Sequence, residues 1–221
     1  MRSSPNRVVR LCQALPDARS GRVVFVSHCL LNQNTRYLGG AACPGAVRSA
    51  IEDYLDEGVG IVQMDCPEQR TWGGVLKRRF LWLVDHPSLA RAPRLVAAVT
   101  RWYLGIRYRR LARDVARDIA DYTSSGFEVT GLVGVAGSPS CGAGTTLDLE
   151  AAVRALGACP HRSPTTQWLN DEVIEAAMRP GSGLFMDALG AELARRNLTV
   201  STTEVVVRTG GANGEPRRSV S

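Results

Sequence analysis

Three short runs of β-branched and aliphatic residues in this chain each lead, within a few positions, to a cysteine. The runs span 22–27, 59–64 and 129–136, and they are followed by Cys29, Cys66 and Cys141. Runs of this length and composition are typical of strands buried in a parallel sheet. Because parallel strands end at the same edge of a sheet, the pattern predicts that the three cysteines meet there, although 37 and 75 positions separate them.

Helical patterns lie between and after these runs. Spacing of three and four between apolar residues predicts helices over 44–58, 108–122, 165–178 and 183–196. Their expected inward residues are Val47, Ile51, Tyr54 and Leu55, then Leu111, Val115, Ile119 and Tyr122, and in the last helix Leu184, Phe185, Leu189 and Leu193. Residues 198–201 are a candidate fourth strand, and 143–163 look irregular. Alternating strands and helices predict an α/β fold. We expect a single Rossmann-like domain with a mostly parallel open sheet, flanking helices and a basic helical insertion.

The chain of 221 residues is long enough to bury a full core, and one domain is the default expectation. We assign residues 1–20 to an N-terminal extension, 21–209 to the α/β domain and 76–122 to the insertion. Residues 210–221, rich in Gly, Arg, Ser and Pro, are expected to form a disordered tail. The first 20 residues hold no apolar stretch typical of a secretion signal, so the expected compartment is the cytoplasm.

Six cysteines in a reducing compartment argue against a disulfide framework and favour metal binding or catalysis. Three thiolates at one sheet edge suit a metal centre that keeps one coordination position open. The alternative for each cysteine is simple packing, because free cysteines are often buried. The remaining cysteines stand in dissimilar contexts and are interpreted as structural: Cys12, Cys43 and Cys159.

The turn that carries the third cysteine reads GSPSCG over 137–142 and invites comparison with a phosphate-binding loop. Its glycines match the first half of a P-loop, but Ala143 and Gly144 stand where that motif needs Lys and Ser or Thr. Nucleotide binding is therefore not expected. The backbone N–H groups of the turn remain suited to an anion such as sulfide or a thiolate.

The chain resembles the thiouracil desulfidase-like family of iron–sulfur enzymes, in its desulfidase-related branch. Four strings carry the resemblance, in the order of the family: VSHCLLNQNTRYLGG, GIVQMDCPEQ, VGVAGSPSCG and GSGLFMDAL. The resemblance implies a compact Rossmann-like fold in which Cys29, Cys66 and Cys141 bind a [4Fe-4S] cluster, one iron of which is free to take sulfur. The chain departs from the founding type in its CLLNQN string and its basic insertion, which concern the substrate rather than the cluster.

Polar residues near the three cysteines are the candidates for chemistry and for substrate binding. Glu68 is the candidate general acid/base, with helix capping as its alternative. Ser138 and Ser140 are candidate hydrogen-bond donors to substrate or cluster sulfur, or else they stabilise the turn. Asn32, Asn34 and Arg36 are candidate substrate-binding residues, with a carboxylate partner as the alternative for Arg36. The histidines His28 and His161 have no partners at ligand spacing and are interpreted as surface or core residues.

The predicted activity is therefore a non-redox desulfidase that removes sulfur from a small thioamide or thionucleobase-like molecule. The alternative is a protein that binds sulfide or a metal at the same three cysteines without turnover.

The basic insertion leaves two interpretations open. Between residues 76 and 122, eleven Lys and Arg stand against four Asp, an excess of seven, while the rest of the chain sums to minus one. This local charge is weak evidence for nucleic-acid binding, which is not expected. Arg91, Arg94 and Arg101 interrupt its apolar residues well before the ~20 residues needed to span a membrane. The segment is either a lid over the cysteine site or an amphipathic element that contacts a membrane or a partner.

Overall fold

The computed structural model describes residues 10, 14–158, 165–207 and 218–219. Its main sheet has the strand order β2-β1-β3-β6-β7, with the first four strands parallel and β7 antiparallel to β6. The bounds are β1 Arg22–Ser27, β2 Gly60–Met64, β3 Glu128–Val135, β6 Thr202–Val205 and β7 Arg218–Ser219. The first three strands lie within one residue of the predicted runs. The predicted α/β fold with a mostly parallel, helix-flanked sheet is confirmed.

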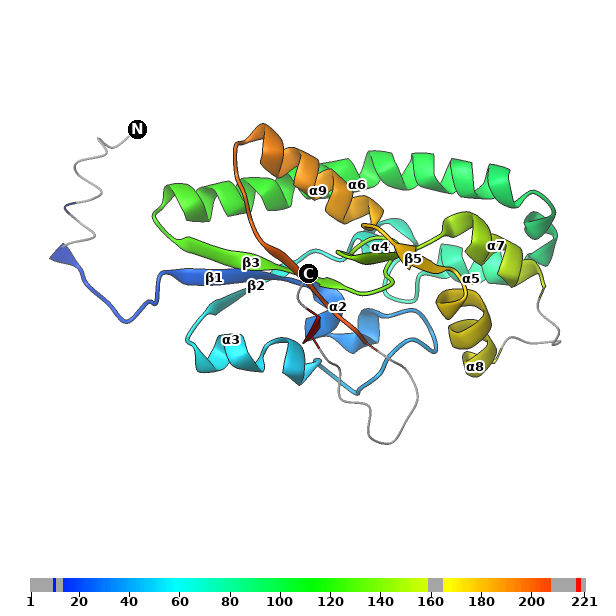
Figure 1. Cartoon of the computed structure of the whole chain (residues 1–221), viewed down its shortest axis with the longest axis horizontal. Coiled ribbons are helices and arrows are strands. Elements are labelled where there is room, and N and C mark those ends of the chain that lie inside the picture. Colours follow the sequence, from blue (N-terminus) through cyan, green and yellow to red (C-terminus); the bar gives the residue numbers. More distant parts are fainter. Residues whose placement is uncertain (1–9, 11–13, 159–164, 208–217, 220–221) are drawn as a thin grey trace.

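Helices cover both faces of this sheet (Figure 1). The α-helices are α2 His28–Leu31, α3 Glu52–Asp56, α4 Pro67–Thr71, α5 Arg78–Val84, α6 Pro93–Ser124, α7 Leu149–Gly157, α8 Thr166–Trp168 and α9 Leu184–Arg195. Short 3-10 helices span Gln33–Thr35 (η1), Arg48–Ala50 (η2) and Pro87–Arg91 (η3), and a π-helix spans Leu169–Glu175 (η4). A two-stranded sheet pairs β4 Thr145–Leu147 with β5 Met178–Pro180.

The central strand β1 divides the core because its side chains alternate between the two faces. Val23 and Phe25 pack with buried residues of α6 and α9, including Phe185, Leu189 and Leu193 of the four inward residues predicted for α9; the fourth, Leu184, is half-buried. Val24 and Val26 pack on the other face against Leu30 of α2 and the segment around η2. Figure 1 shows the same layers, with α6 and α9 on one side of the sheet and α3 on the other.

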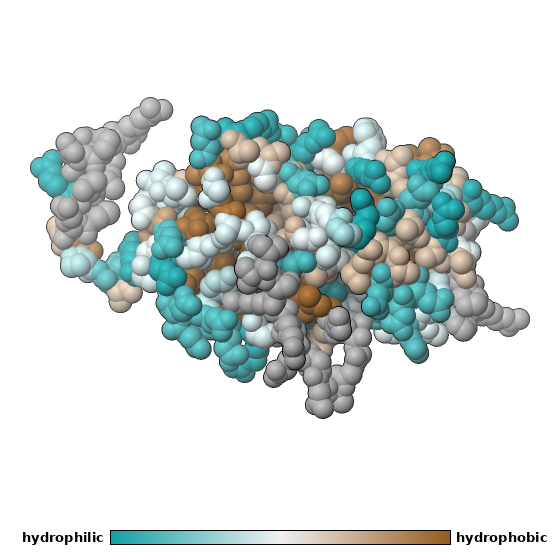
Figure 2. Space-filling model, in the orientation of Figure 1, coloured by the Kyte–Doolittle hydropathy of each residue, from teal (hydrophilic) through white to brown (hydrophobic). Residues whose placement is uncertain are grey.

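The helix predicted over 44–58 is mostly absent. Only η2 and the single turn of α3 form there, because the N–H of Val47 donates to the carbonyl of Leu30 at 2.7 Å and holds the start of the segment as a loop. Leu55, predicted to face inward, is 57% exposed. Hydrophilic side chains accordingly surround α3, at the lower left of Figure 2.

Other boundaries also differ from the prediction. The helix expected over 108–122 is the second half of the 32-residue α6. The stretch 143–163 contains β4 and α7, and the helix expected over 165–178 breaks into α8, η4 and the start of β5. The fourth strand begins at Thr202 rather than at Leu198, whose N–H instead donates to the carbonyl of Leu193 at the end of α9.

Some predictions fall on residues that the structure does not describe. They include most of the N-terminal extension and of the tail, together with Cys12, Cys159 and His161; the two described tail residues form β7. Within the described part of the chain, none of the helices combines the length and apolar character needed to cross a bilayer.

Candidate functional site

Cys29, Cys66 and Cys141 all line one cavity of about 660 Å³, at the ends of β1, β2 and β3. The three strands are neighbours in the sheet, so their loops emerge side by side. Cys66 and Cys141 are buried, and Cys29 is half-buried. A cavity of this size suits a small molecule, since ligand pockets are typically about 300–1,000 Å³.

Local structure holds the first two cysteines in place. Cys66 is the N-cap residue of α4, and its Sγ accepts a hydrogen bond from the N–H of Gln69 at 3.3 Å. Cys29 lies in α2, directly after β1. Its carbonyl accepts a hydrogen bond from Nε2 of the buried Gln33 at 2.6 Å, and Oε1 of Gln33 accepts one from the N–H of Ala42 at 3.0 Å.

The third cysteine sits in the tight turn after β3. Oγ of Ser138 accepts hydrogen bonds from the N–H groups of Ser140 and Cys141 at 3.3 and 3.0 Å, so this serine does stabilise the turn. Oγ of Ser140 lies 3.7 Å from Sγ of Cys141 and points at the cavity side chains. The two hydroxyls also lie 3.1 Å apart, within hydrogen-bond distance, and both serines line the cavity.

Backbone N–H groups at the N-terminus of α9 donate hydrogen bonds to this turn. The N–H of Leu184 donates to the carbonyl of Pro139 at 2.9 Å, and the N–H of Phe185 donates to that of Ser140 at 3.1 Å. A Cβ at Gly183 would lie 2.4 Å from the Ser140 carbonyl oxygen, and no side chain fits there. The string GSGLFMDAL thus contributes backbone that fixes the third cysteine loop.

A buried ion pair lies next to the cysteines. Glu68 Oε2 pairs with Nζ of Lys77, and Glu68 Oε1 accepts a hydrogen bond from Oγ of Ser140 at 2.9 Å. Burial opposes ionisation of Glu68, but Lys77 and the Ser140 hydroxyl hold the pKa of this carboxyl below its usual value. Lys77 has a backbone φ of 50°, a left-handed conformation that is uncommon outside glycine. The sequence gives no sign of this lysine's role, because it lies in a loop nine positions after Glu68.

Burial raises the pKa of all three thiols. The pKa of Cys66 rises to about 12, first through burial and then through the charge of Glu68. That of Cys141 rises well above its ordinary value through burial and through the neighbouring Cys29 and Cys66. The mutual influence places the three sulfurs in one electrostatic environment. With raised pKa values the three thiols are protonated and neutral near pH 7, and a metal centre bound here would have to displace their protons.

The predicted substrate-binding residues divide into two groups. Arg36 lines the cavity, and its Nε donates to the carbonyl of Gly40 at 2.9 Å. Asn32 and Asn34 are not among the lining residues. The side chain of Asn32 instead caps η1 and accepts hydrogen bonds from the backbone and side-chain nitrogens of Asn34 at 3.1 and 2.9 Å.

His28 was interpreted from the sequence as a surface or core residue, but it lines the cavity beside Cys29. Its Nδ1 is buried and has no hydrogen-bond partner among the described residues. Burial lowers the pKa of this imidazole, so the neutral form predominates near pH 7. An unsatisfied buried nitrogen is costly. Because this atom has almost no accessible surface, it is not part of the cavity wall, although other atoms of His28 are.

The three cysteines suit some metal centres and not others. No group of three or more His, Cys, Asp or Glu side chains in the described part of the chain is arranged to hold a single metal ion. A [4Fe-4S] cluster is different, because each cysteine binds a separate iron and its ligands stand farther apart. The fourth described cysteine, Cys43, does not line the cavity, and its thiol donates to the carbonyl of Ala46 at 3.4 Å. Three soft donors around one roomy cavity fit a cluster with one open iron.

Part of the cavity wall comes from the basic insertion. Lys77, Phe80 of α5 and Ala97 and Thr100 of α6 are lining residues. The inner side of the insertion therefore forms part of the wall of the cavity that the three cysteines also line.

One carboxylate holds the loop that follows Cys141. Oε2 of the buried Glu204, on β6, accepts hydrogen bonds from the N–H groups of Ala143, Gly144 and Thr145 at 3.1, 2.8 and 3.1 Å.

We expect Glu204→Ala to lower the free energy of unfolding by about 2–4 kcal/mol, because it leaves buried N–H groups unpaired. Urea denaturation measures this. The control Glu57→Ala, which removes an exposed ion pair with Arg22, should cost less than about 1 kcal/mol; equal losses would contradict the prediction.

The comparisons with known proteins add no relative. No protein-family model, no curated protein and no solved structure matches the chain.

Proposed function

We propose that this protein is a desulfidase that removes sulfur from a small thiolated molecule, such as a thioamide or thionucleobase, at a [4Fe-4S] cluster held by three cysteines. The observation that carries the proposal is the cavity itself: Cys29, Cys66 and Cys141 line it together with the carboxylate of Glu68. The thiouracil desulfidase-like strings and a Rossmann-like topology belong to the same proposal, and the parallel order β2-β1-β3-β6 supports that topology.

The cluster, when bound, supplies a thiophilic and Lewis-acidic iron. The residues of the chain supply proton transfer and binding. Glu68, ionised beside Lys77, takes a proton from water, and Ser140 orients its carboxylate through the 2.9 Å hydrogen bond. Overall, the oxygen of water joins the carbon, the C–S bond breaks and sulfur leaves as hydrogen sulfide, so no external electrons are needed. Arg36, which lines the cavity, binds the polar part of the substrate.

The role of Glu68 is tested in a variant that removes both charges of the Glu68–Lys77 ion pair, so that neither is left unpaired. Glu68→Gln alone would leave Lys77 without its carboxylate, so Glu68→Gln is combined with Lys77→Met. We expect this double variant to bind iron and acid-labile sulfide normally and to release sulfide from 2-thiouracil about a hundredfold to ten-thousandfold more slowly. Asn34→Ala, on an exposed side chain outside the cavity, is the control and should keep full activity. Full activity in the double variant would exclude Glu68 as the base.

The same assay separates the proposal from its alternative. Protein purified without oxygen should contain iron and acid-labile sulfide and should release sulfide from 2-thiouracil or a related thioamide. Iron and sulfide without release from any such compound would favour a sulfide-binding protein without turnover. Zinc in place of iron would overturn the cluster itself.

A further inference from the structure

The first half of α6 has two apolar faces on opposite sides. The inner face packs into the protein through the buried side chains of Ala97, Leu104 and Tyr108. The outer face is also apolar: Leu95, Val99, Trp102 and Ile106 are 65%, 56%, 69% and 42% exposed. Their spacings of four, three and four place them in one stripe, which is about 16 Å long at 1.5 Å per residue. We call these four residues the outer stripe.

A helix on a protein surface normally turns polar residues outward, and the second half of α6 does so. Arg113, Asp114, Arg117 and Asp118 are exposed there. The outer stripe breaks this rule over three turns of one helix. Figure 2 shows hydrophobic atoms reaching the surface along the upper right edge, where the first half of α6 lies. A contiguous exposed apolar stripe of this kind marks a binding surface.

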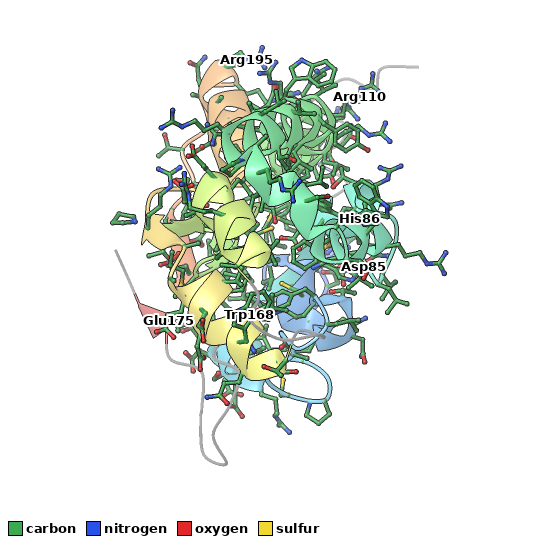
Figure 3. The ribbon with its side chains drawn as sticks, turned by 90° about the vertical axis from the view of Figure 1, so that its right-hand side faces the viewer. Asp85, His86, Arg110, Trp168, Glu175 and Arg195 are labelled. Carbon is green, nitrogen blue, oxygen red and sulfur yellow. The ribbon has the colours of Figure 1, made fainter. Side chains whose placement is uncertain are left out.

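Within the helix segment that carries the outer stripe, the charge has one sign, although Arg94 and Arg113 pair with Glu150 and Glu192 of other helices. Residues 93–113 contain six arginines and no Asp or Glu. Arg109 and Arg110 follow Ile106 by three and four positions and so continue the stripe, and Figure 3 shows Arg110 at the outer edge of the molecule. Arg101, Arg109 and Arg110 make no ion pair within the described ranges. The partner must therefore combine an apolar layer with negative charge.

We propose that the outer stripe and its arginines dock the protein on an anionic lipid membrane. The stripe enters the boundary between head groups and acyl chains, with Trp102 at the interface that tryptophan prefers, while the arginines contact lipid phosphates. A second copy of the chain fits poorly, because pairing these faces brings arginines together. Nucleic acid offers no partner for Leu95, Val99 and Ile106. The opposite side of the same part of α6 carries Ala97 and Thr100, which line the cavity. The docked face is therefore the side of the helix that points away from the cavity.

Vesicle flotation tests the apolar part of this surface. We expect the full chain to bind vesicles of phosphatidylcholine mixed with phosphatidylserine, and to bind phosphatidylcholine alone much more weakly. Val99→Glu combined with Trp102→Glu should weaken binding to the anionic vesicles at least about tenfold, because it removes apolar burial and adds negative charge. The control is Leu55→Glu, at a similarly exposed leucine on α3, on the other side of the sheet; it should bind like the wild type.

A second variant tests the charge. Arg109→Gln with Arg110→Gln should weaken binding to the anionic vesicles roughly 25-fold, at about fivefold for each arginine, and high salt should weaken binding of the wild type. All substituted side chains are exposed, and circular dichroism checks that the variants fold. Equal binding by the wild type and the Val99/Trp102 variant would overturn the proposal. So would a stable dimer in sedimentation that this variant abolishes, because the stripe would then be a self-association surface.

Discussion

Anaerobically purified Cys66→Ser protein is expected to lack iron and acid-labile sulfide while keeping the native fold. Serine is a favoured N-cap residue, so its hydroxyl replaces Sγ as the acceptor for the N–H of Gln69, and α4 keeps its start. A hydroxyl is a poor ligand for iron in a cluster compared with a thiolate. Loss of the cluster without loss of the fold separates the ligand role of Cys66 from a packing role.

Matched variants make this test specific. Cys29→Ser and Cys141→Ser should lose the cluster as well, because each supplies one of three ligands and the remaining two cannot hold it. Cys43→Ser should retain full iron and sulfide, since Cys43 does not line the cavity. Iron and acid-labile sulfide analysis measures the cluster content of each variant, and circular dichroism measures whether the variant is folded. A wild-type cluster in the Cys66→Ser protein would refute the three-cysteine centre, and cluster loss in the Cys43→Ser protein would show that the assay reports general damage.

Lys77→Met is expected to be the most destabilising single change near the site, lowering the free energy of unfolding by about 3–5 kcal/mol. The methionine leaves the carboxylate of Glu68 buried without its cation; the side chains of Lys77 and Glu68 are only 6% and 16% exposed. The sign follows from the pKa: Glu68 has a lowered pKa in the folded protein, so the pair contributes stability above the unfolded pKa of this carboxyl. That contribution is lost as the pH falls through the folded pKa.

A double-mutant cycle isolates the pair. Adding Glu68→Gln to Lys77→Met removes the stranded charge and should recover most of the loss in urea denaturation at neutral pH. Arg70→Ala is the control for a surface pair, because Arg70 and Asp65 are 62% and 50% exposed, and it should cost less than about 1 kcal/mol. If the double variant is as unstable as Lys77→Met alone, then Lys77 stabilises the fold through packing rather than through Glu68.

The sheet and the grouping of the cysteines were predictable for a physical reason. Strands of a parallel sheet are rich in β-branched and aliphatic residues, so 22–27, 59–64 and 129–136 stood out in the sequence, although the edge strand β2 is only partly buried. Parallel pairing then places the ends of those strands at one edge, and the cysteines there share a cavity. Recognising the strands and placing their ends at one edge of a parallel sheet do not require knowledge of which side chains far apart in the sequence contact each other.

Other features depend on contacts that the pattern does not reveal. Lys77 reaches Glu68 only because its loop adopts a left-handed turn, and a lone lysine among arginines gives no such signal. Asn32 and Asn34 were predicted to bind a substrate, but short polar side chains readily form local hydrogen bonds. Asn32 caps η1, and the side chain of Asn34 donates to that of Asn32. The insertion was predicted to be helical, but the start of α6 within it was not located. The two apolar faces in the first half of α6 cancel the one-sided periodicity by which a surface helix is recognised.

The hydrogen bond from Oγ of Ser27 to the carbonyl of Val133, at 2.9 Å, joins positions 106 residues apart. The strand β1 therefore gains its second neighbour, β3, late in synthesis. Cys29 leaves the ribosome long before β3 and Cys141 are made. Under the proposed function, a chain that ends before Cys141 lacks one of the three cluster ligands, so we expect the cluster to bind only after the chain is made and folded beyond this residue. A cluster that binds only the native state would add its binding free energy to the free energy of unfolding of the protein.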